Sequence, residues 1–138
     1  MLANGITLSY KTKSGSDYTV LTGLKEVPEI GSDKEKVDNT DLSANNKQYE
    51  YGTGDYGDLE YKFKYENKNA NSPYRVLRQA ADDNEVLSFR EQLPDGTTYE
   101  YDAQVSVKLG GGSSNSPLEF TVKMAIQSDI EVKDPLGA

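Results

Sequence analysis

The chain has 138 residues, a length typical of one domain, and its 23 acidic and 15 basic residues give a net charge of -8. This acidic excess argues against a conventional nucleic-acid reader, whose affinity comes largely from lysine and arginine on phosphate. Cysteine and histidine are both absent from the sequence, which excludes disulfides, thiolate metal sites and the usual general base of enzymes.

The first elements are expected to be a short hairpin followed by a long polar stretch. Ile6, Leu8 and Tyr10 alternate with polar residues as in a half-buried strand, and residues 18–21 resume extended structure after a turn. Residues 23–56 are mostly polar, and we expect short strands within them at 25–28, 35–39 and 48–51. Compact domains seldom keep such long exposed loops without a function, so this stretch is predicted to make contacts.

Three glycines at 52, 54 and 57 have the spacing of a dinucleotide-binding loop. That motif works only between a strand and a helix whose N-terminus holds the phosphates. Residues 58–66 instead alternate apolar and charged side chains, which predicts a strand. The glycines are therefore predicted to form turns or a bulge before that strand, not a nucleotide site.

One helix and three long strands are expected in the second half of the chain. Ser72 and Pro73 are suited to a helix start, and Tyr74, Leu77 and Ala81 share one helical stripe. Strands are predicted at residues 86–93, 99–109 and 118–126, with a tight reversal at 93–98 and a flexible loop at 110–117. Residues 128–138 are expected to form a thinly apolar arm.

These elements predict a mainly β fold for one domain spanning residues 1–138. We expect seven or eight mostly antiparallel strands arranged as a two-sheet sandwich or barrel-like domain, with one flanking helix and a long extended loop at about 31–57. Ten tyrosines supplement a modest supply of Leu, Ile, Val and Phe. Because a tyrosine ring can be buried while its hydroxyl stays wet, we expect much of this surface to be completed by partners.

No catalytic, cofactor or metal site is predicted. Carboxylates cluster at residues 38–41, 55–60, 82–85 and 129–134, but none of these clusters has the spacing of an EF-hand, and we assign them to turns and caps. Paired carboxylates drawn from 55–60 and 82–85 leave an enzyme as an open alternative. The basic residues Lys62, Lys64, Arg75, Arg78 and Arg90 alternate with acids and are assigned to solvated faces or intersubunit pairs.

Four segments together resemble the major tail tube protein of long, non-contractile-tailed bacteriophages. They are "VDNTDLSANNKQYEYGTGDYGDLEYKFKYE", "SPYRVLRQAA", "FREQLPDGTTYEYDAQVSVK" and "PLEFTVKMAIQSDIEV". The positions that fit the family pattern are Val37, Asp38, Thr40, Gly57, Leu59, Tyr61, Pro94, Gly96, Phe120, Val122, Ser128 and Ile130. Asp129 departs from that pattern, since glycine is frequent there.

The resemblance implies a structural virion protein that assembles as hexameric rings, which stack into the tube through which DNA passes into the host. The long loop at 31–57 would reach the adjacent ring, and the arm at 128–138 would bridge subunits or rings. It further implies tape measure, tail terminator and distal tail proteins as partners, DNA only as passing cargo, and synthesis in the bacterial host cytoplasm. No membrane association is expected, because no apolar run approaches the roughly 20 residues of a membrane span.

The resemblance also points to two groups of site residues. The candidates for contact between rings are Asp38, Asp41, Tyr49, Tyr51, Asp55 and Tyr56. The candidates for the lumen of the tube are Glu60, Lys62 and Lys64 on one strand and Glu100, Asp102, Gln104 and Ser106 on another. An acidic lumen would give DNA phosphate little to adhere to.

Two alternatives stay open beside the enzyme. The chain could be the tube subunit of a phage-derived tailocin or prophage particle, or a small ligand-binding β-barrel that uses its interior as a pocket.

Overall fold

The structure is a computed structural model that describes residues 1–43 and 45–135. Within these residues the chain forms ten strands and one helix. In chain order they are β1 (Thr7–Thr12), β2 (Thr19–Leu21), β3 (Leu24–Glu26), β4 (Asp33–Asp38), β5 (Tyr49–Asp55), β6 (Leu59–Lys64), α1 (Pro73–Asp82), β7 (Val86–Gln92), β8 (Thr98–Leu109), β9 (Glu119–Ile126) and β10 (Glu131–Lys133).

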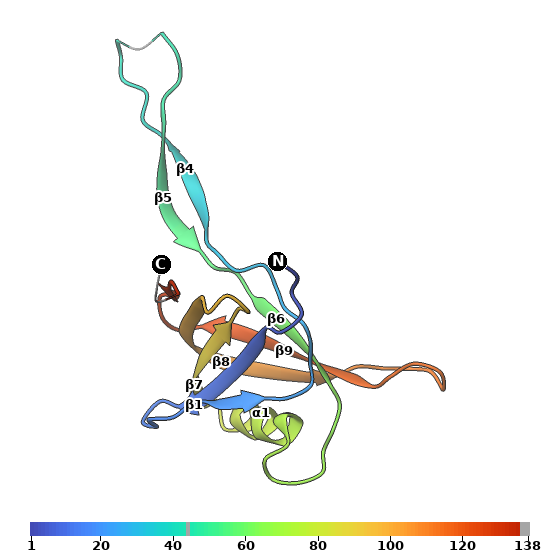
Figure 1. Ribbon diagram of the computed structural model, residues 1–138. Coiled ribbons are helices and arrows are strands. Elements are labelled where there is room, and N and C mark those ends of the chain that lie inside the picture. The colour runs from blue at the N-terminus through green and yellow to red at the C-terminus, as the bar shows by residue number, and fades with distance from the viewer. Residues whose placement is uncertain (44, 136–138) are drawn as a thin grey trace.

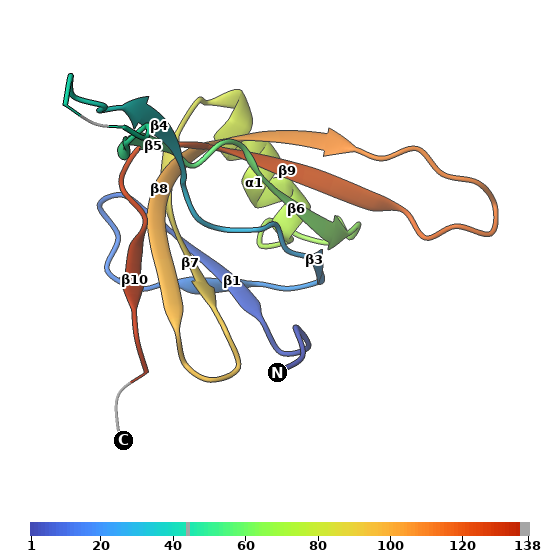
Figure 2. The ribbon, with the colours of Figure 1, turned by 90° about the horizontal axis from the view of Figure 1, so that it is seen from above.

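Eight of the strands form one antiparallel sheet that bends along β8 (Figure 2). The first part of β8 pairs with β7, and residues 98–100 also pair with β10 on the opposite edge. Residues 103–109 of β8 pair with β9. We therefore distinguish a first half, made of β2, β1, β7, the start of β8 and β10, from a second half, made of the end of β8, β9, β6 and β3.

The hydrophobic core lies between these two halves. Phe89 and Tyr101 stack at 5.9 Å between ring centroids in the first half, and Phe63 and Phe120 stack at 5.3 Å in the second. The Tyr101 hydroxyl donates a hydrogen bond to the Tyr61 hydroxyl across the core at 2.9 Å. Alternation along β6 and β9 places the apolar side chains inward and the charged ones outward, as the sequence predicts.

The expected fold class is confirmed, with a refinement of how the sheets are arranged. Two antiparallel sheets and one helix are present, and the second sheet is the pair β4–β5. The sandwich itself is made by the larger sheet folding over on itself through β8. The chain has more strands than expected, because the polar stretch pairs as a hairpin and residues of the C-terminal arm pair with β8.

Helix α1 covers one end of the core (Figure 1). Leu77 and Ala80 are buried, and the Tyr74 ring meets the rings of Phe120 and Tyr65 edge-on at 5.2 and 4.9 Å. Pro73 occupies the first turn as predicted. Ser72 is the N-cap residue as predicted, but its hydroxyl makes no capping bond. It instead accepts hydrogen bonds from the backbone N–H groups of Lys68 and Asn69, which order the loop before the helix.

The glycine motif forms the bulge and the turn that the sequence predicts. Lys34 pairs with Gly54 and Lys36 pairs with Tyr51, so residues 52 and 53 together oppose Glu35, which is a bulge. Gly57 has φ of +67° in the turn between β5 and β6, a conformation that favours glycine. Since a strand follows and no helix does, the phosphate-binding alternative has no structural basis.

Candidate assembly surface

Hairpin β4–β5 projects from the body of the protein, at the end opposite α1 (Figure 1). Every residue of β4 is exposed, and so are Tyr49 and Tyr51 on β5, with exposed fractions of 55% and 67%. Leu42 near the tip is fully exposed. An isolated two-stranded hairpin is marginally stable in water, because it has no buried face.

Polar contacts at the tip give the hairpin its local order. The backbone N–H of Thr40 donates to a carboxylate oxygen of Asp38 at 3.0 Å. Hydrogen bonding from the side chain and the backbone of Thr40 lowers the pKa of Asp38. The Gln48 N–H donates to the Thr40 hydroxyl at 2.8 Å, and the Asp41 carboxylate accepts bonds from Ser43. The candidates Asp38 and Asp41 therefore shape the tip.

The two faces of the hairpin carry opposite charge. Residues directly opposite in an antiparallel pair share a face. One face, which we call the lysine–tyrosine face, consists of Lys34, Lys36, Asp38, Tyr49 and Tyr51. The other, the acidic face, consists of Asp33, Glu35, Val37, Glu50 and Asp55.

In the described part of the chain, no residue of either face forms an ion pair. Lys36 lies 6.0 Å from the centre of the Tyr49 ring, and neither it nor Lys34 belongs to any ion pair within residues 1–43 and 45–135. On the acidic face Asp33 stands directly opposite Asp55, a like-charge pair that is destabilising in an isolated sheet.

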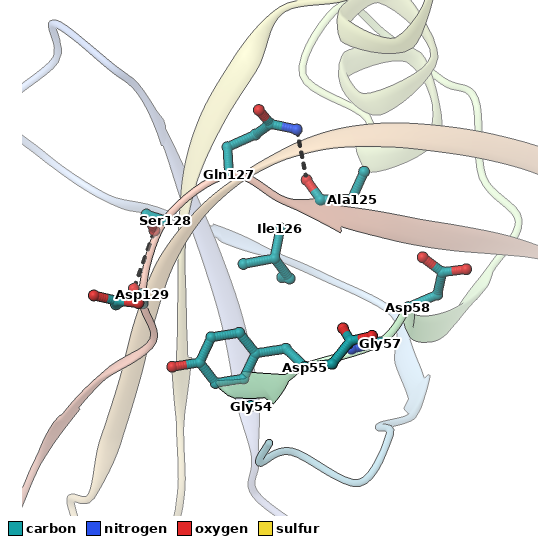
Figure 3. A pocket seen from close by; sticks show the side chains of 10 residues that line it. Gly54, Asp55, Gly57, Asp58, Ala125, Ile126, Gln127, Ser128 and Asp129 are labelled. Atoms are coloured by element: carbon teal, nitrogen blue, oxygen red, sulfur yellow. Dashed lines mark hydrogen bonds between the residues drawn. The ribbon is translucent and has the colours of Figure 1, made fainter. Parts of the chain in front are cut away.

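An open groove of about 820 Å³ lies at the root of the hairpin (Figure 3). It runs between the end of β5 with its turn and the end of β9, and its lining residues are Gly54, Asp55, Tyr56, Gly57, Asp58, Ala125, Ile126, Gln127, Ser128 and Asp129. The Tyr56 hydroxyl accepts a hydrogen bond from the Ile130 N–H at 3.3 Å, which ties the two walls together. The candidates Asp55 and Tyr56 thus belong to the hairpin root.

The lumen candidates on β6 lie on the outer surface of the second half. Glu60 pairs with Lys123 at 3.4 Å and Lys62 with Glu26 at 3.6 Å, while Lys64 stands opposite Glu119 in the register. Glu119 accepts a 2.7 Å bond from Lys25, which lowers the pKa of that carboxyl. Most of these lysines are therefore neutralised by adjacent carboxylates.

The lumen candidates on β8 lie mainly on the outer surface of the first half. Glu100 forms a 2.7 Å ion pair with Lys133 of β10, which raises the pKa of Lys133. Asp102 accepts a 2.6 Å bond from the Ser88 hydroxyl, and Gln104 donates to the backbone oxygen of Asn84. Ser106 follows the bend of β8 and pairs with Lys123 of the second half. Since Lys123 also pairs with Glu60, Ser106 shares the outer surface of the β6 group, whereas Glu100 and Asp102 lie beyond the bend.

The core contains a buried polar network that was not predicted from the sequence. The Tyr61 hydroxyl donates to the Glu91 carboxylate at 2.7 Å while accepting from Tyr101, and Glu91 is only 4% exposed. Burial raises the pKa of Glu91, and the bond from Tyr61 partly offsets this shift. The alternation Leu87, Phe89, Glu91 already placed one carboxylate on the buried face of its strand, and that signal could have revealed the network.

Other chemistry is not indicated by the described residues. Among residues 1–43 and 45–135, no group of three or more acidic side chains is arranged to hold a metal ion. Helix α1 is too short to cross a membrane, and no membrane-spanning helix occurs in the described part of the chain.

Comparison with known proteins gives one family and several similar structures. The model of the phage tail tube protein family matches residues 5–133. No curated protein sequence matches the chain.

Three solved structures illustrate the similarity of fold. A chain from the tail of an empty gene transfer agent particle, determined with C6 symmetry, is 22% identical, with a TM-score of 0.72 and coverage of 95% of this chain and 98% of that one. A chain from the sixfold-symmetrised baseplate of the anti-feeding prophage is 13% identical, with a TM-score of 0.74 and coverage of 96% and 95%. A chain of the SPP1 tail tube is 8% identical, with a TM-score of 0.70 and coverage of 96% and 78%.

Proposed function

Because the chain belongs to the phage tail tube protein family, we propose that it polymerises as stacked hexameric rings and forms a tail tube through which DNA passes into the host. The observation that carries this proposal is that hairpin β4–β5 projects from the body of the protein and exposes two tyrosines, Tyr49 and Tyr51. Two of the similar structures come from sixfold-symmetric assemblies, which supports six copies in each ring.

The hairpin is the proposed contact between rings. Extended chain rises about 3.3 Å per residue, so the five residue steps from Asp33 to Asp38, which pairs with Tyr49, place Tyr49 roughly 16 Å beyond the root of the hairpin. In the proposed stack this projection brings the exposed Tyr49 and Tyr51 rings to the body of a neighbouring copy. Asp38 and Asp41 shape the tip, while Asp55 and Tyr56 fix the root, so the six contact candidates hold or present one projecting element.

We assign the lumen to the β6 group together with Ser106, and not to Glu100 and Asp102. The second half of the sheet offers open strands on both sides: residues 105–109 of β8 have no partner in β7, and β3 pairs with β6 at only two positions. Such edges can pair with neighbouring copies and continue the sheet around a ring. The ion pairs of Lys25, Lys62 and Lys123 also leave fewer free cations for phosphate to bind.

The remaining partners follow from the family. We propose tape measure, tail terminator and distal tail proteins at the inside and the two ends of the tube, with DNA as passing cargo. Synthesis in the host cytoplasm and bridging by the C-terminal arm belong to the same proposal. Strand β10 of that arm pairs with β8, and residues 136–138 lie outside the described residues.

A tube from a phage-derived device is the second candidate. The similar structures include the anti-feeding prophage baseplate and the sheath/tube terminator of an extracellular contractile injection system, the latter with a TM-score of 0.71. Both candidate functions require the same kind of tube, so neighbouring genes that encode the rest of the particle would distinguish a phage from a phage-derived device. The ligand-binding barrel is less favoured, since aromatic side chains fill the space between the two halves.

Electron microscopy of the concentrated, purified protein tests the proposal. We expect rings or tubes with sixfold symmetry. Since the native sequence has no cysteine, Glu60→Cys and Asp102→Cys each create a unique label site. In assembled tubes a bulky maleimide should label position 102 faster than position 60. Protein that stays monomeric at all concentrations would contradict the function, whereas faster labelling at 60 would contradict only the lumen assignment.

A further inference from the structure

Resting on the proposed function, we propose that the lysine–tyrosine face of hairpin β4–β5 docks into the groove at the hairpin root of a copy in the next ring. The contact would join Lys34, Lys36, Tyr49 and Tyr51 of one copy to the groove between residues 54–58 and 125–129 of the other.

The lysine–tyrosine face has the composition of a docking surface. Tyrosine is enriched at protein interfaces, since its ring gives contact area while its hydroxyl finds polar partners. Both rings are more than half exposed, and Lys34 and Lys36 lack ion-pair partners in the described part of the chain. The partner of this face should therefore be acidic and concave.

The groove meets both requirements. Asp58 and Asp129 stand on opposite walls, Asp55 lies between them, and Ile126 points into the space from the end of β9 (Figure 3). Asp55 accepts a bond from the Gly57 N–H, but none of the three carboxylates has an ion-pair partner within the described ranges. The groove thus combines an apolar side chain with carboxylates that form no ion pair among the described residues.

Geometry selects the body of another copy as the receptor. The hairpin extends away from its own root, so its distal part with Tyr49 lies far from its own groove, whereas Lys34 pairs with Gly54 at the edge of that groove (Figure 1). In a ring of six, equivalent points on neighbouring copies are as far from each other as each is from the ring axis. Hairpins of the same ring could stack on one another, at about 10 Å between sheets, only if they stood about 10 Å from the axis, where they would block the bore.

Charge also selects the face. Asp33, Glu35 and Glu50 on the acidic face would repel the carboxylates of the groove, whereas Lys34 and Lys36 would attract them. The acidic face should consequently point away from the groove.

Charge reversal tests the contact in three variants and one mixture. The variant Lys34→Glu/Lys36→Glu places acid opposite acid, and Asp58→Lys/Asp129→Lys places base opposite base. We expect at least a tenfold loss of polymer for each by sedimentation and microscopy, with unchanged thermal unfolding of the monomer, because all four positions are exposed. The quadruple variant, which again has a net charge of -8, should recover tubes. An equimolar mixture of the two double variants should also polymerise, because each supplies the charge that the other lacks.

The matched control is Glu35→Lys/Glu50→Lys on the acidic face, which should still polymerise. Failure of both the quadruple variant and the mixture to polymerise, while the wild type forms tubes, would overturn the groove as receptor and leave the function standing. The variant that combines Lys34→Glu/Lys36→Glu with Glu35→Lys/Glu50→Lys reverses both faces of the hairpin. If it recovers tubes, the groove is not the receptor and the hairpins contact one another instead. A wild type that never polymerises would overturn both proposals.

Discussion

The body of the protein and hairpin β4–β5 are both antiparallel β structure, yet they are stabilised in different ways. In the body, alternating side chains meet across a core that contains Tyr61, Phe63, Phe89 and Phe120, all fully buried. In the hairpin the same alternation separates lysine and tyrosine from most of the carboxylates, and β4 is exposed along its whole length. Alternation alone therefore does not define a core, since burial also requires a facing surface.

Removing the hairpin should have the largest effect on assembly and almost none on folding. Asp33 and Asp55 are paired, so a short glycine-rich turn can join residues 32 and 56 in place of residues 33–55. We expect a folded monomer with the wild-type unfolding temperature and a complete loss of tubes by electron microscopy. Tubes of normal length from this variant would show that the hairpin is dispensable for stacking.

Truncating one ring in each region should separate their roles. Phe120 stacks on Phe63 and contacts Tyr74, so Phe120→Ala should lower the free energy of unfolding by about 3–5 kcal/mol. Tyr51→Ala removes an exposed ring and should change monomer stability by less than about 0.5 kcal/mol. Urea denaturation measures both values, and a large loss from Tyr51→Ala would mean that the hairpin has a core contact.

Removing one hydroxyl should have a smaller effect, again confined to the body. Tyr61→Phe leaves the buried Glu91 carboxylate without its donor and Tyr101 without its acceptor, which should cost about 1–3 kcal/mol in the same denaturation experiment. Tyr49→Phe is the matched control and should leave monomer stability unchanged. Equal stability of the two variants would rule out a stabilising role for the network.

The pH dependence of stability should show the smallest difference. Burial raises the folded-state pKa of Glu91 above that of the unfolded chain. The stability contributed by its bound proton is thus present below the unfolded-state pKa of about 4.3 and lost as the pH rises through the folded-state value. The stability of the wild type relative to Glu91→Gln should fall from pH 4 toward pH 7. A difference that stays constant with pH would contradict a raised pKa.

The sequence was informative where one side of a strand is apolar. Leu59, Tyr61 and Phe63 predicted β6 and its buried face, and Pro73 with Leu77 predicted the helix. The pairing of β4 with β5 was less evident, because polar side chains on both faces leave no periodic signal.

The groove was not predictable in this way. Its walls, at residues 54–58 and 125–129, are far apart in the chain and meet only because β6 pairs with β9. The lumen candidates illustrate the same limit, since the bend of β8 separates Glu100 and Asp102 from Glu60 and Lys62, and local alternation does not reveal that bend.

Amide hydrogen exchange of residues 33–38 and 49–55, compared between monomer and polymer, tests most directly whether sister copies complete the hairpin. We expect fast exchange of these amides in the monomer and strong protection in the polymer, while the amides of β8 and β9 are protected in both. Hairpin amides that exchange equally fast in both states would contradict the account, as would amides already protected in the monomer.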